Sequence, residues 1–262
     1  MPRRAVRTLV RRHRRGATTT APDELIVEEP LEIRLDGHLV TTTMRTPGHD
    51  FELAAGLCLG DGLLGGATVR GIAYCATGDA VSSAFNVVTV DTGGLAPPVV
   101  RRLSGATSSC GLCGSASIEQ LVERLPPVVP RASFDLDVLV TVPEWVAAEQ
   151  ELFSRTGSVH AAAAFTETGS VVVREDVGRH NAVDKVIGRL LLDGRLPAAS
   201  LGLYVSGRAS FEIVQKAWAG GFATVVAVSA PTALAVETAR TAGITLAGFV
   251  RGDRLTLYSP PP

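Results

Sequence analysis

Cysteine is scarce in this sequence. There are four cysteines in 262 residues, and only Cys110 and Cys113 lie close together. A structural zinc site requires four ligands, and no second cysteine pair follows to complete one. A disulfide across so short a spacing requires an oxidising compartment or a redox role. What remains is the chemistry of a thiolate that attacks, accepts or passes on sulfur.

Long apolar runs are also absent, and no stretch resembles a membrane span. The arginine-rich beginning is not followed by the apolar segment that a secretory or twin-arginine signal carries. We therefore expect a cytoplasmic protein with reduced thiols and no membrane partner. A chain of this length can bury a sizeable core, as one large domain or two small ones.

The formal net charge of −1 is unevenly distributed along the chain. Seven arginines lie among the first fifteen residues: Arg3, Arg4, Arg7, Arg11, Arg12, Arg14 and Arg15. The remaining residues are acidic overall, which argues against a nucleic-acid partner. We predict that residues 1–22 form a disordered basic tail, able at most to make a weak contact with an acidic partner.

The first half of the chain predicts a small α+β domain over residues 23–130. Apolar residues alternate with polar ones at 31–35, and Asp36-Gly37 is typical of a turn to a second strand at 39–44. Asp50 is expected to cap a helix that ends near Leu59. Two further strands are expected at 69–74 and 85–90. A mobile Gly/Ser-rich loop, about residues 92–116, would carry the cysteine pair, and a proline-rich linker would close the domain.

The second half, residues 131–262, alternates helices with strands. A helix is expected at 143–155, with its proline in the first turn. The predicted strands and helices that follow are 159–165, 171–174, 183–191, 201–205, 211–219, 224–228, 232–242, 244–250 and 255–258. This alternation predicts an α/β fold whose sheet is covered by helices on both faces.

Polar clusters follow several of the predicted strands in this second half. They occupy residues 174–181, 206–210, 229–232 and 249–254, and most of them combine arginine with glycine or serine. In open α/β sheets, ligands bind at the carboxyl ends of strands, beside the N-termini of helices. Arginine suits a phosphate group there. One such cluster alone would indicate a capped helix, but four together favour a nucleotide-like ligand.

The order of elements matches the cytidine-deaminase-like fold, a three-layer architecture. In that fold a zinc ion is held by a His-x-Glu motif and by a Pro-Cys-x-x-Cys motif, and the Glu is the general acid/base. Here the corresponding residues are His180-Asn181-Ala182 and Ser206-Gly207-Arg208. Because the metal ligands and the acid/base are missing, we predict no metal site and no deamination. His180 would either orient a ligand or cap and pack.

Several motifs together resemble the FdhD family, the formate dehydrogenase accessory sulfurtransferases. The resemblance runs from about Asp23 to Tyr258. The motifs are Thr46-Pro47-Gly48, Glu52-Leu53-Ala54, Ser109-Cys110-Gly111-Leu112-Cys113-Gly114, Gly157-Ser158-Val159-His160-Ala161-Ala162, the segment Glu175–Lys185, Ser206-Gly207-Arg208, Ser229-Ala230-Pro231-Thr232 and the segment Phe249–Arg254.

The resemblance implies a sulfur carrier. Such proteins take persulfide sulfur from a cysteine desulfurase and pass it to the molybdenum or tungsten cofactor of formate dehydrogenase. Cys110 corresponds to the persulfide carrier and Cys113 to the second thiol. The acceptor, a molybdenum bis(molybdopterin guanine dinucleotide), would be bound by the C-terminal domain, in a protein that is usually a homodimer. The residues assigned to it are Ser206, Gly207, Arg208, His180, Phe249, Val250, Arg251, Gly252, Asp253 and Arg254.

Other interpretations stay open at this point. The chain could be a chaperone that shields the cofactor and has non-catalytic cysteines, a Cys-x-x-Cys redox protein, or a zinc protein that adds His160 or His180 to the pair. Arg101 and Arg102 would either lower the pKa of a loop thiol or be solvated. Similarly, His160 would either transfer protons or pack in the core. Cys58 and Cys75 are expected to be structural.

Overall fold

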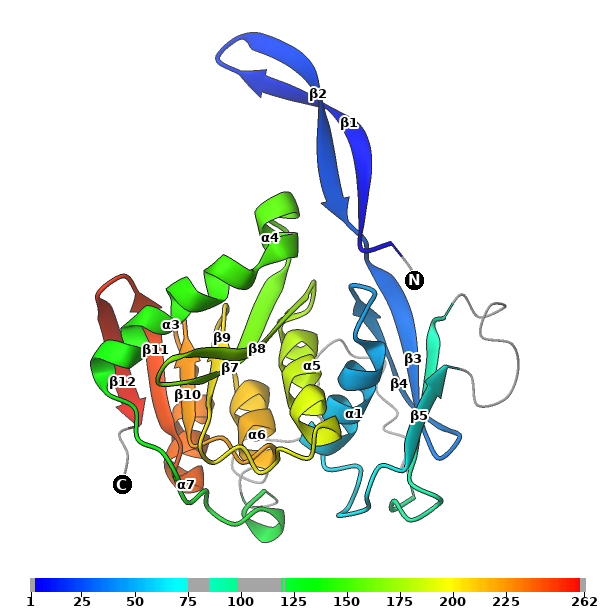
Figure 1. The fold of residues 1–262 in the computed structure, drawn as a ribbon, viewed down its shortest axis with the longest axis vertical. Coiled ribbons are helices and arrows are strands. Elements are labelled where there is room, and N and C mark those ends of the chain that lie inside the picture. The colour runs from blue at the N-terminus through cyan, green and yellow to red at the C-terminus, as the bar shows by residue number, and fades with distance from the viewer. Residues whose placement is uncertain (1–2, 75–84, 99–118, 120, 260–262) are drawn as a thin grey trace.

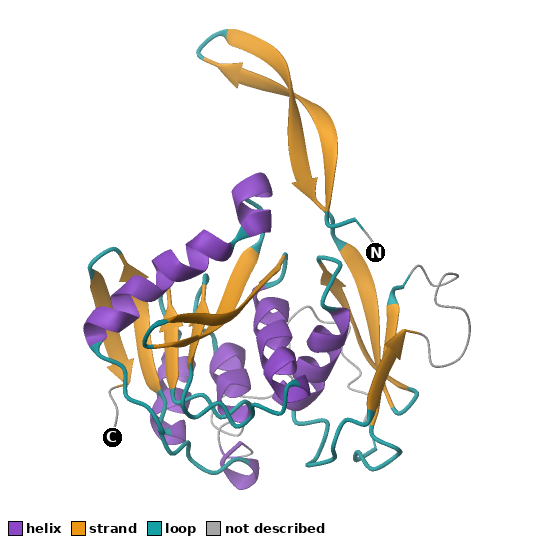
Figure 2. Cartoon of the chain, in the orientation of Figure 1, coloured by secondary structure: helices purple, strands orange, loops and turns teal. Residues whose placement is uncertain are grey.

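The computed structural model describes residues 3–74, 85–98, 119 and 121–259. Within this part of the chain the strands form three sheets, and helices cover both faces of the largest one (Figure 1, Figure 2). None of the described helices is both long and apolar enough to cross a membrane.

The largest sheet has the order β12-β11-β10-β9-β7-β8. Its strands are β7 (His160–Thr166), β8 (Gly169–Asp176), β9 (Gly202–Val205), β10 (Thr224–Ala227), β11 (Thr245–Arg251) and β12 (Arg254–Ser259). Strands β9, β10 and β11 are parallel, whereas β7 and β12 run antiparallel to their neighbours. The carboxyl ends of the three parallel strands therefore meet at one edge of the sheet.

The side chains on the two faces of this sheet pack into two separate cores. Ala162, Leu203 and Val225 face the helices α5 (Arg179–Leu192), α6 (Phe211–Ala219) and α7 (Ala233–Ala242). On the other face, Ala163 and Val226 pack against α3 (Leu136–Glu149). The predicted α/β fold with helices on both faces is confirmed. Thr232, the first residue of the helix predicted at 232–242, caps α7: its side chain accepts a hydrogen bond from the N–H of Ala235 at 3.3 Å.

The second sheet belongs to the N-terminal half and has the order β4-β3-β6-β5. Its strands are β3 (Glu29–Leu35), β4 (His38–Arg45), β5 (Gly71–Tyr74) and β6 (Val87–Asp91). Helix α1 (Asp50–Gly60) buries Leu53 and Leu57 against this sheet and also packs on α5. Asp50 is not the cap that the sequence suggested. His49 occupies that position at φ 58°, and Asp50 instead forms a buried ion pair with Arg45 at 3.0 Å.

The expectation of a disordered tail over residues 1–22 is wrong for the residues described. Ala5–Arg14 (β1) and Ala17–Ile26 (β2) pair as an antiparallel hairpin that stands away from the other sheets (Figure 1). Arg15 and Gly16 form its turn at φ 44° and 84°. This is the geometry of a two-residue turn whose twist matches that of the strands. Valine and threonine in β1, and threonine and isoleucine in β2, favour extended backbone.

The helix expected at 143–155 is also different. Helix α3 begins at Leu136, seven residues earlier, and contains Pro143 in its interior. A separate short helix, α4 (Glu151–Thr156), follows after Gln150. The buried positions Leu139, Val142 and Val146 explain the early start, because their 3-4 spacing places them together against the sheet. The domain boundary predicted near residue 130 stays a prediction.

Candidate functional site

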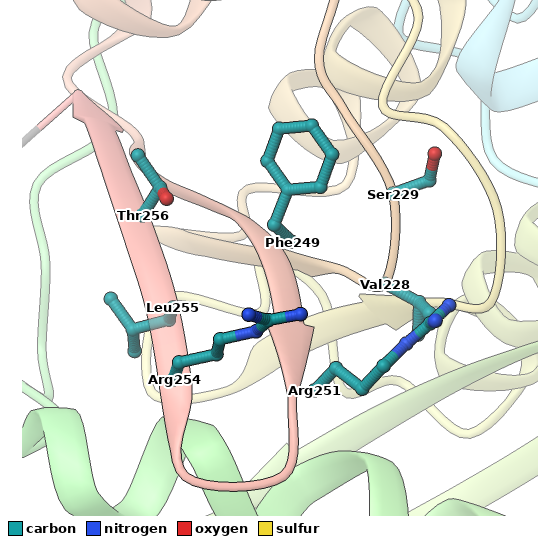
Figure 3. Close-up of a pocket in the computed structure, with 7 residues that line it drawn as sticks. All are labelled: Val228, Ser229, Phe249, Arg251, Arg254, Leu255 and Thr256. Carbon is teal, nitrogen blue, oxygen red and sulfur yellow. The ribbon is translucent and has the colours of Figure 1, made fainter.

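A cavity of about 480 Å³ lies where β10 ends and the β11–β12 hairpin turns. The side chains that give it chemical character are Phe249, Arg251, Arg254, Ser229 and Thr256 (Figure 3). Val228 and Leu255 complete its wall. This is the edge at which the sequence predicted a nucleotide-like ligand.

Phe249 is presented to this cavity by an unusual backbone. Its φ is 52°, in the left-handed region that residues other than glycine rarely occupy. The pairing of β11 with β12 is irregular here, between Gly248 and Arg251, and the N–H of Phe249 donates instead to the carbonyl of Ser229 at 3.3 Å. The side chain is 49% exposed. An exposed ring on a strained backbone is available to stack on a flat ligand.

Arg251 and Arg254 supply positive charge to the same cavity. They are opposite one another across the β11–β12 pairing, and both are exposed. Neither side chain has an ion-pair or hydrogen-bond partner among the described residues. In Figure 3, Arg254 extends from β12 toward β11 and Arg251 extends toward Val228. Two unneutralised guanidinium groups beside an aromatic ring form a site for an anion attached to a flat group.

The other residues of the 249–254 segment have different positions. Val250 is fully buried in the core beneath α3, so its side chain does not face the cavity. Gly252, at φ 59°, and Asp253 form the turn between the two strands. Their contribution is therefore to hold Arg251 and Arg254 on facing strands.

A second cavity of about 420 Å³ adjoins the first and shares Val228 with it. Its polar lining includes His160 and Ser206. Ser206 Oγ accepts a hydrogen bond from the N–H of Ala161 at 2.9 Å and lies 3.3 Å from His160 Nδ1. Burial, together with the positive charge of Arg179, lowers the pKa of His160. A neutral imidazole held by a hydroxyl can donate or accept a hydrogen bond in this cavity.

Not every residue that the sequence singled out lies in the two cavities. His180 lines neither of them: its Nε2 lies 3.3 Å from Ser210 Oγ and 3.5 Å from a Glu212 oxygen, which ties it to the beginning of α6. Arg208 is exposed and lines neither. Gly207 leaves room for two neighbours, since a Cβ there would lie 3.4 Å from Arg179 Cδ and 3.7 Å from His160 Cε1.

The cysteines divide into two groups. Cys110 and Cys113 lie outside the described residues, as do Cys75, Arg101 and Arg102. Cys58, in α1, is fully buried, and burial raises the pKa of its thiol to about 12. A thiol with that pKa is protonated at neutral pH and is a poor nucleophile. The prediction that Cys58 is structural is confirmed.

Val228, Leu255 and Thr256 line the first cavity although no sequence motif pointed to them. Thr256 could have been found, because it lies two residues after Arg254 on one strand and so shares its face. Among the described residues, no group of three or more His, Cys, Asp or Glu side chains is placed to hold a metal ion.

Comparison with known proteins gives a consistent result. The model of the FdhD/NarQ family matches residues 26–262. Two proteins named sulfur carrier protein FdhD are each 48% identical to this chain. The one from Streptomyces avermitilis covers 99% of this chain and 95% of its own length, and the one from Corynebacterium efficiens covers 92% and 90%.

A solved structure supports the fold. The crystal structure of a candidate formate dehydrogenase accessory protein from Desulfotalea psychrophila superposes with a TM-score of 0.76 at 22% identity. The match covers 98% of this chain and 97% of that one. With a family model across most of its length and close relatives named as sulfur carriers, the chain belongs to the FdhD/NarQ family.

Proposed function

We propose that this chain is a sulfurtransferase that serves formate dehydrogenase. It would take persulfide sulfur from a cysteine desulfurase and deliver it to a molybdenum bis(molybdopterin guanine dinucleotide), which is the acceptor substrate. The observation that carries the proposal is the near full-length match to sulfur carrier proteins in a chain that contains the Cys110-Gly-Leu-Cys113 motif. Cytoplasmic location and a homodimeric state are part of the same proposal.

The first step assigns Cys110 as the carrier. Its thiolate attacks the outer sulfur of the donor's persulfide. A new S–S bond forms on Cys110 as the donor's S–S bond breaks, the donor leaves as a thiolate, and no net oxidation occurs. A cysteine flanked by glycine suits this step, because glycine allows the backbone many conformations.

The second step assigns Cys113 to release. Attack of its thiolate on the inner sulfur of Cys110 expels hydrosulfide and leaves a Cys110–Cys113 disulfide. A thiol reductant then restores both thiols. The sulfur atom is thereby delivered at the oxidation level of sulfide, which is the form that a metal ion binds.

The acceptor is assigned to the edge of the large sheet. Phe249 would stack on the guanine, and Arg251 and Arg254 would bind the phosphates, in the 480 Å³ cavity. Parallel strands, with helices that begin at this edge, support a cytidine-deaminase-like architecture for residues 131–262. In that architecture the metal ligands would come from the positions of His180 and of residues 206–208, and of these Ser206 lines the second cavity.

Mass spectrometry of the intact protein tests the proposal. The wild type, Cys110→Ala, Cys113→Ala and the control Cys58→Ala are each incubated with an active cysteine desulfurase and cysteine. We expect a gain of one sulfur atom in every protein except Cys110→Ala. If no variant gains sulfur, the chain is not a carrier, and the alternative function, a chaperone that binds the cofactor through Arg251 and Arg254, takes its place.

A further inference from the structure

The β1–β2 hairpin, here called the arm (Ala5–Ile26), is the most unusual surface of the molecule. In Figure 1 its turn points away from both larger sheets. Every residue from Arg11 to Thr20 is exposed. The strands pair continuously from Ala5 with Ile26 to Arg14 with Ala17, so the arm is a regular ribbon rather than a loop. At about 3.3 Å per residue it is roughly 30 Å long.

The base of the arm is fixed to the remaining structure. Glu24 forms ion pairs with Arg7 at 3.0 Å and with Arg155 of α4 at 2.7 Å. The N–H of Val27 donates to the carbonyl of Arg4 at 2.9 Å. Arg12 pairs with Asp23 at 3.2 Å. The direction of the arm is therefore set before any partner binds, which lowers the entropy cost of binding.

The end of the arm carries uncompensated positive charge. Arg11, Arg14 and Arg15 have no ion-pair or hydrogen-bond partner among the described residues. No acidic residue precedes Asp23 in the sequence. Nearer the base of the arm, the side chain of Leu9 is 73% exposed and that of Leu25 is 48% exposed. A ribbon that combines apolar side chains with free arginines has the composition of a contact surface.

The complementary surface is present on the same chain. Helix α3 covers one face of the large sheet (Figure 1). Its sequence contains no basic residue. Asp135, Asp137 and Glu144 are exposed there, and their side chains have no ion-pair partner in the described part of the chain. Leu136, between the first two, is 49% exposed. Helix α3 therefore offers the opposite charge with an apolar residue beside it.

We infer that the arm of one protomer docks on helix α3 of a second copy of this chain, and that the contact is reciprocal. The inference rests on the homodimer proposed above and names its surface. A twofold axis would bring Arg11, Arg14 and Arg15 of each copy to the acidic helix of the other. Outside the first 22 residues the chain has 18 basic and 26 acidic residues. The rest of each protomer is therefore negatively charged overall and attracts the arm of the other.

Two other arrangements fit the charges less well. Pairing of one arm with another along their open edges would bring two sets of arginines together, which like-charge repulsion opposes. A nucleic acid would meet the acidic bodies of the protein as well as the arms. Docking of the arm on helix α3 is the arrangement that brings the free arginines of the arm to acidic side chains.

Sedimentation velocity of the full-length protein at low and high salt tests this. We expect a wild-type dimer that dissociates as salt rises, because screening weakens attraction between charges. The variant Arg11→Glu/Arg14→Glu/Arg15→Glu should weaken dimerisation by at least about tenfold. The control Arg124→Glu/Arg131→Glu/Arg195→Glu changes the same number of exposed arginines elsewhere and should stay dimeric. Circular dichroism confirms that each variant is folded.

Charge reversal on both surfaces is the decisive measurement. Adding Asp135→Lys, Asp137→Lys and Glu144→Lys to the arm variant should restore the dimer. An arm variant that stays dimeric, a dimer that tightens with salt, or no restoration would each overturn the arm-on-α3 contact while leaving homodimerisation intact. A monomeric wild type would overturn both the arm-on-α3 contact and the homodimer. None of these outcomes bears on sulfur transfer to Cys110.

Discussion

At the scale of single residues, Phe249 holds a conformation that its side chain does not favour. A left-handed backbone costs a residue with a Cβ about 1 kcal/mol relative to glycine. We therefore expect Phe249→Gly to be more stable than Phe249→Ala by about that amount. Urea unfolding of the two variants measures the difference in free energy. Because both variants lack the phenyl ring, the loss of its packing cancels in the comparison.

The exposed position Thr256 on the neighbouring strand is the matched control. It has ordinary extended backbone in β12, where glycine is less favourable than alanine by about 0.5–1 kcal/mol. Thr256→Gly should thus be less stable than Thr256→Ala. If the glycine variant is the less stable one at Phe249 as well as at Thr256, the left-handed backbone of Phe249 carries no strain.

The sequence could predict which segment forms the site but not the backbone conformation that presents Phe249. Alternation along the strand places Phe249 and Arg251 on one face and Val250 on the other, and both Phe249 and Arg251 do line the cavity while Val250 is buried. The left-handed backbone of Phe249 and the irregular pairing between Gly248 and Arg251 have no local signal, because they accompany a hydrogen bond to Ser229, which is distant in sequence.

At the scale of elements, helices α1 and α5 touch backbone to backbone. A Cβ at Gly188 would overlap the carbonyl oxygen of Glu52, and a Cβ at Gly56 would overlap that of Asp184. Helix propensity alone favours Gly188→Ala by about 1 kcal/mol. We expect the opposite sign, a destabilisation of about 2–3 kcal/mol, because the helices must separate to admit a methyl group. Thermal or urea unfolding measures it.

Gly71→Ala serves as the control for this substitution. Gly71 lies in β5, and no atom lies within 4 Å of the position that its Cβ would take. Its replacement should raise the free energy of unfolding by about 0.5–1 kcal/mol, because glycine in a strand is less favourable than alanine. A stabilised Gly188→Ala protein would show that α1 and α5 can separate freely, and that their contact does not fix the beginning of α5 at the site.

Elements were predictable where local signals were sufficient. The helix at 233–242 has its threonine cap and its 3-4 pattern in the sequence itself. The arm was missed because a run of arginines outweighed a weaker signal, the Arg15-Gly16 turn between segments rich in valine and threonine. The start of α3 was missed because Pro143 was taken as a first-turn residue, although the buried stripe begins at Leu139.

At the scale of the whole molecule, buried polar groups join the N-terminal half to the large sheet. Lys185 pairs with Asp176 at 2.7 Å and donates to the carbonyl of Thr46 at 3.0 Å. Asp176 in turn accepts a hydrogen bond from the N–H of Thr46 at 3.1 Å. The Thr46-Pro47-Gly48 motif, which the sequence offered only as a family signature, is thus fixed to the region where α5 begins.

A second link of this kind gives the stability of the molecule a dependence on pH. Glu52 of α1 accepts a hydrogen bond from Arg174 of β8 at 2.9 Å. Burial by itself raises the pKa of Glu52, but hydrogen bonds from Arg174 and His49 outweigh it and lower the pKa from 4.5 to about 2. A carboxyl whose folded-state pKa is depressed stabilises the fold above its unfolded value, and this contribution disappears as the pH falls from 4.5 to about 2.

We expect Glu52→Gln to lower the free energy of unfolding at neutral pH by about 1–2 kcal/mol, since solvent screens part of the pair. The difference from wild type should shrink below pH 4.5 and vanish near pH 2. Asp184, whose pKa burial raises to about 6, titrates in both proteins and cancels in the comparison. Urea unfolding across this pH range measures the difference. If it stays constant down to pH 2, the contribution of Glu52 comes from packing and not from its charge, and the two halves of the molecule are not joined by this ion pair.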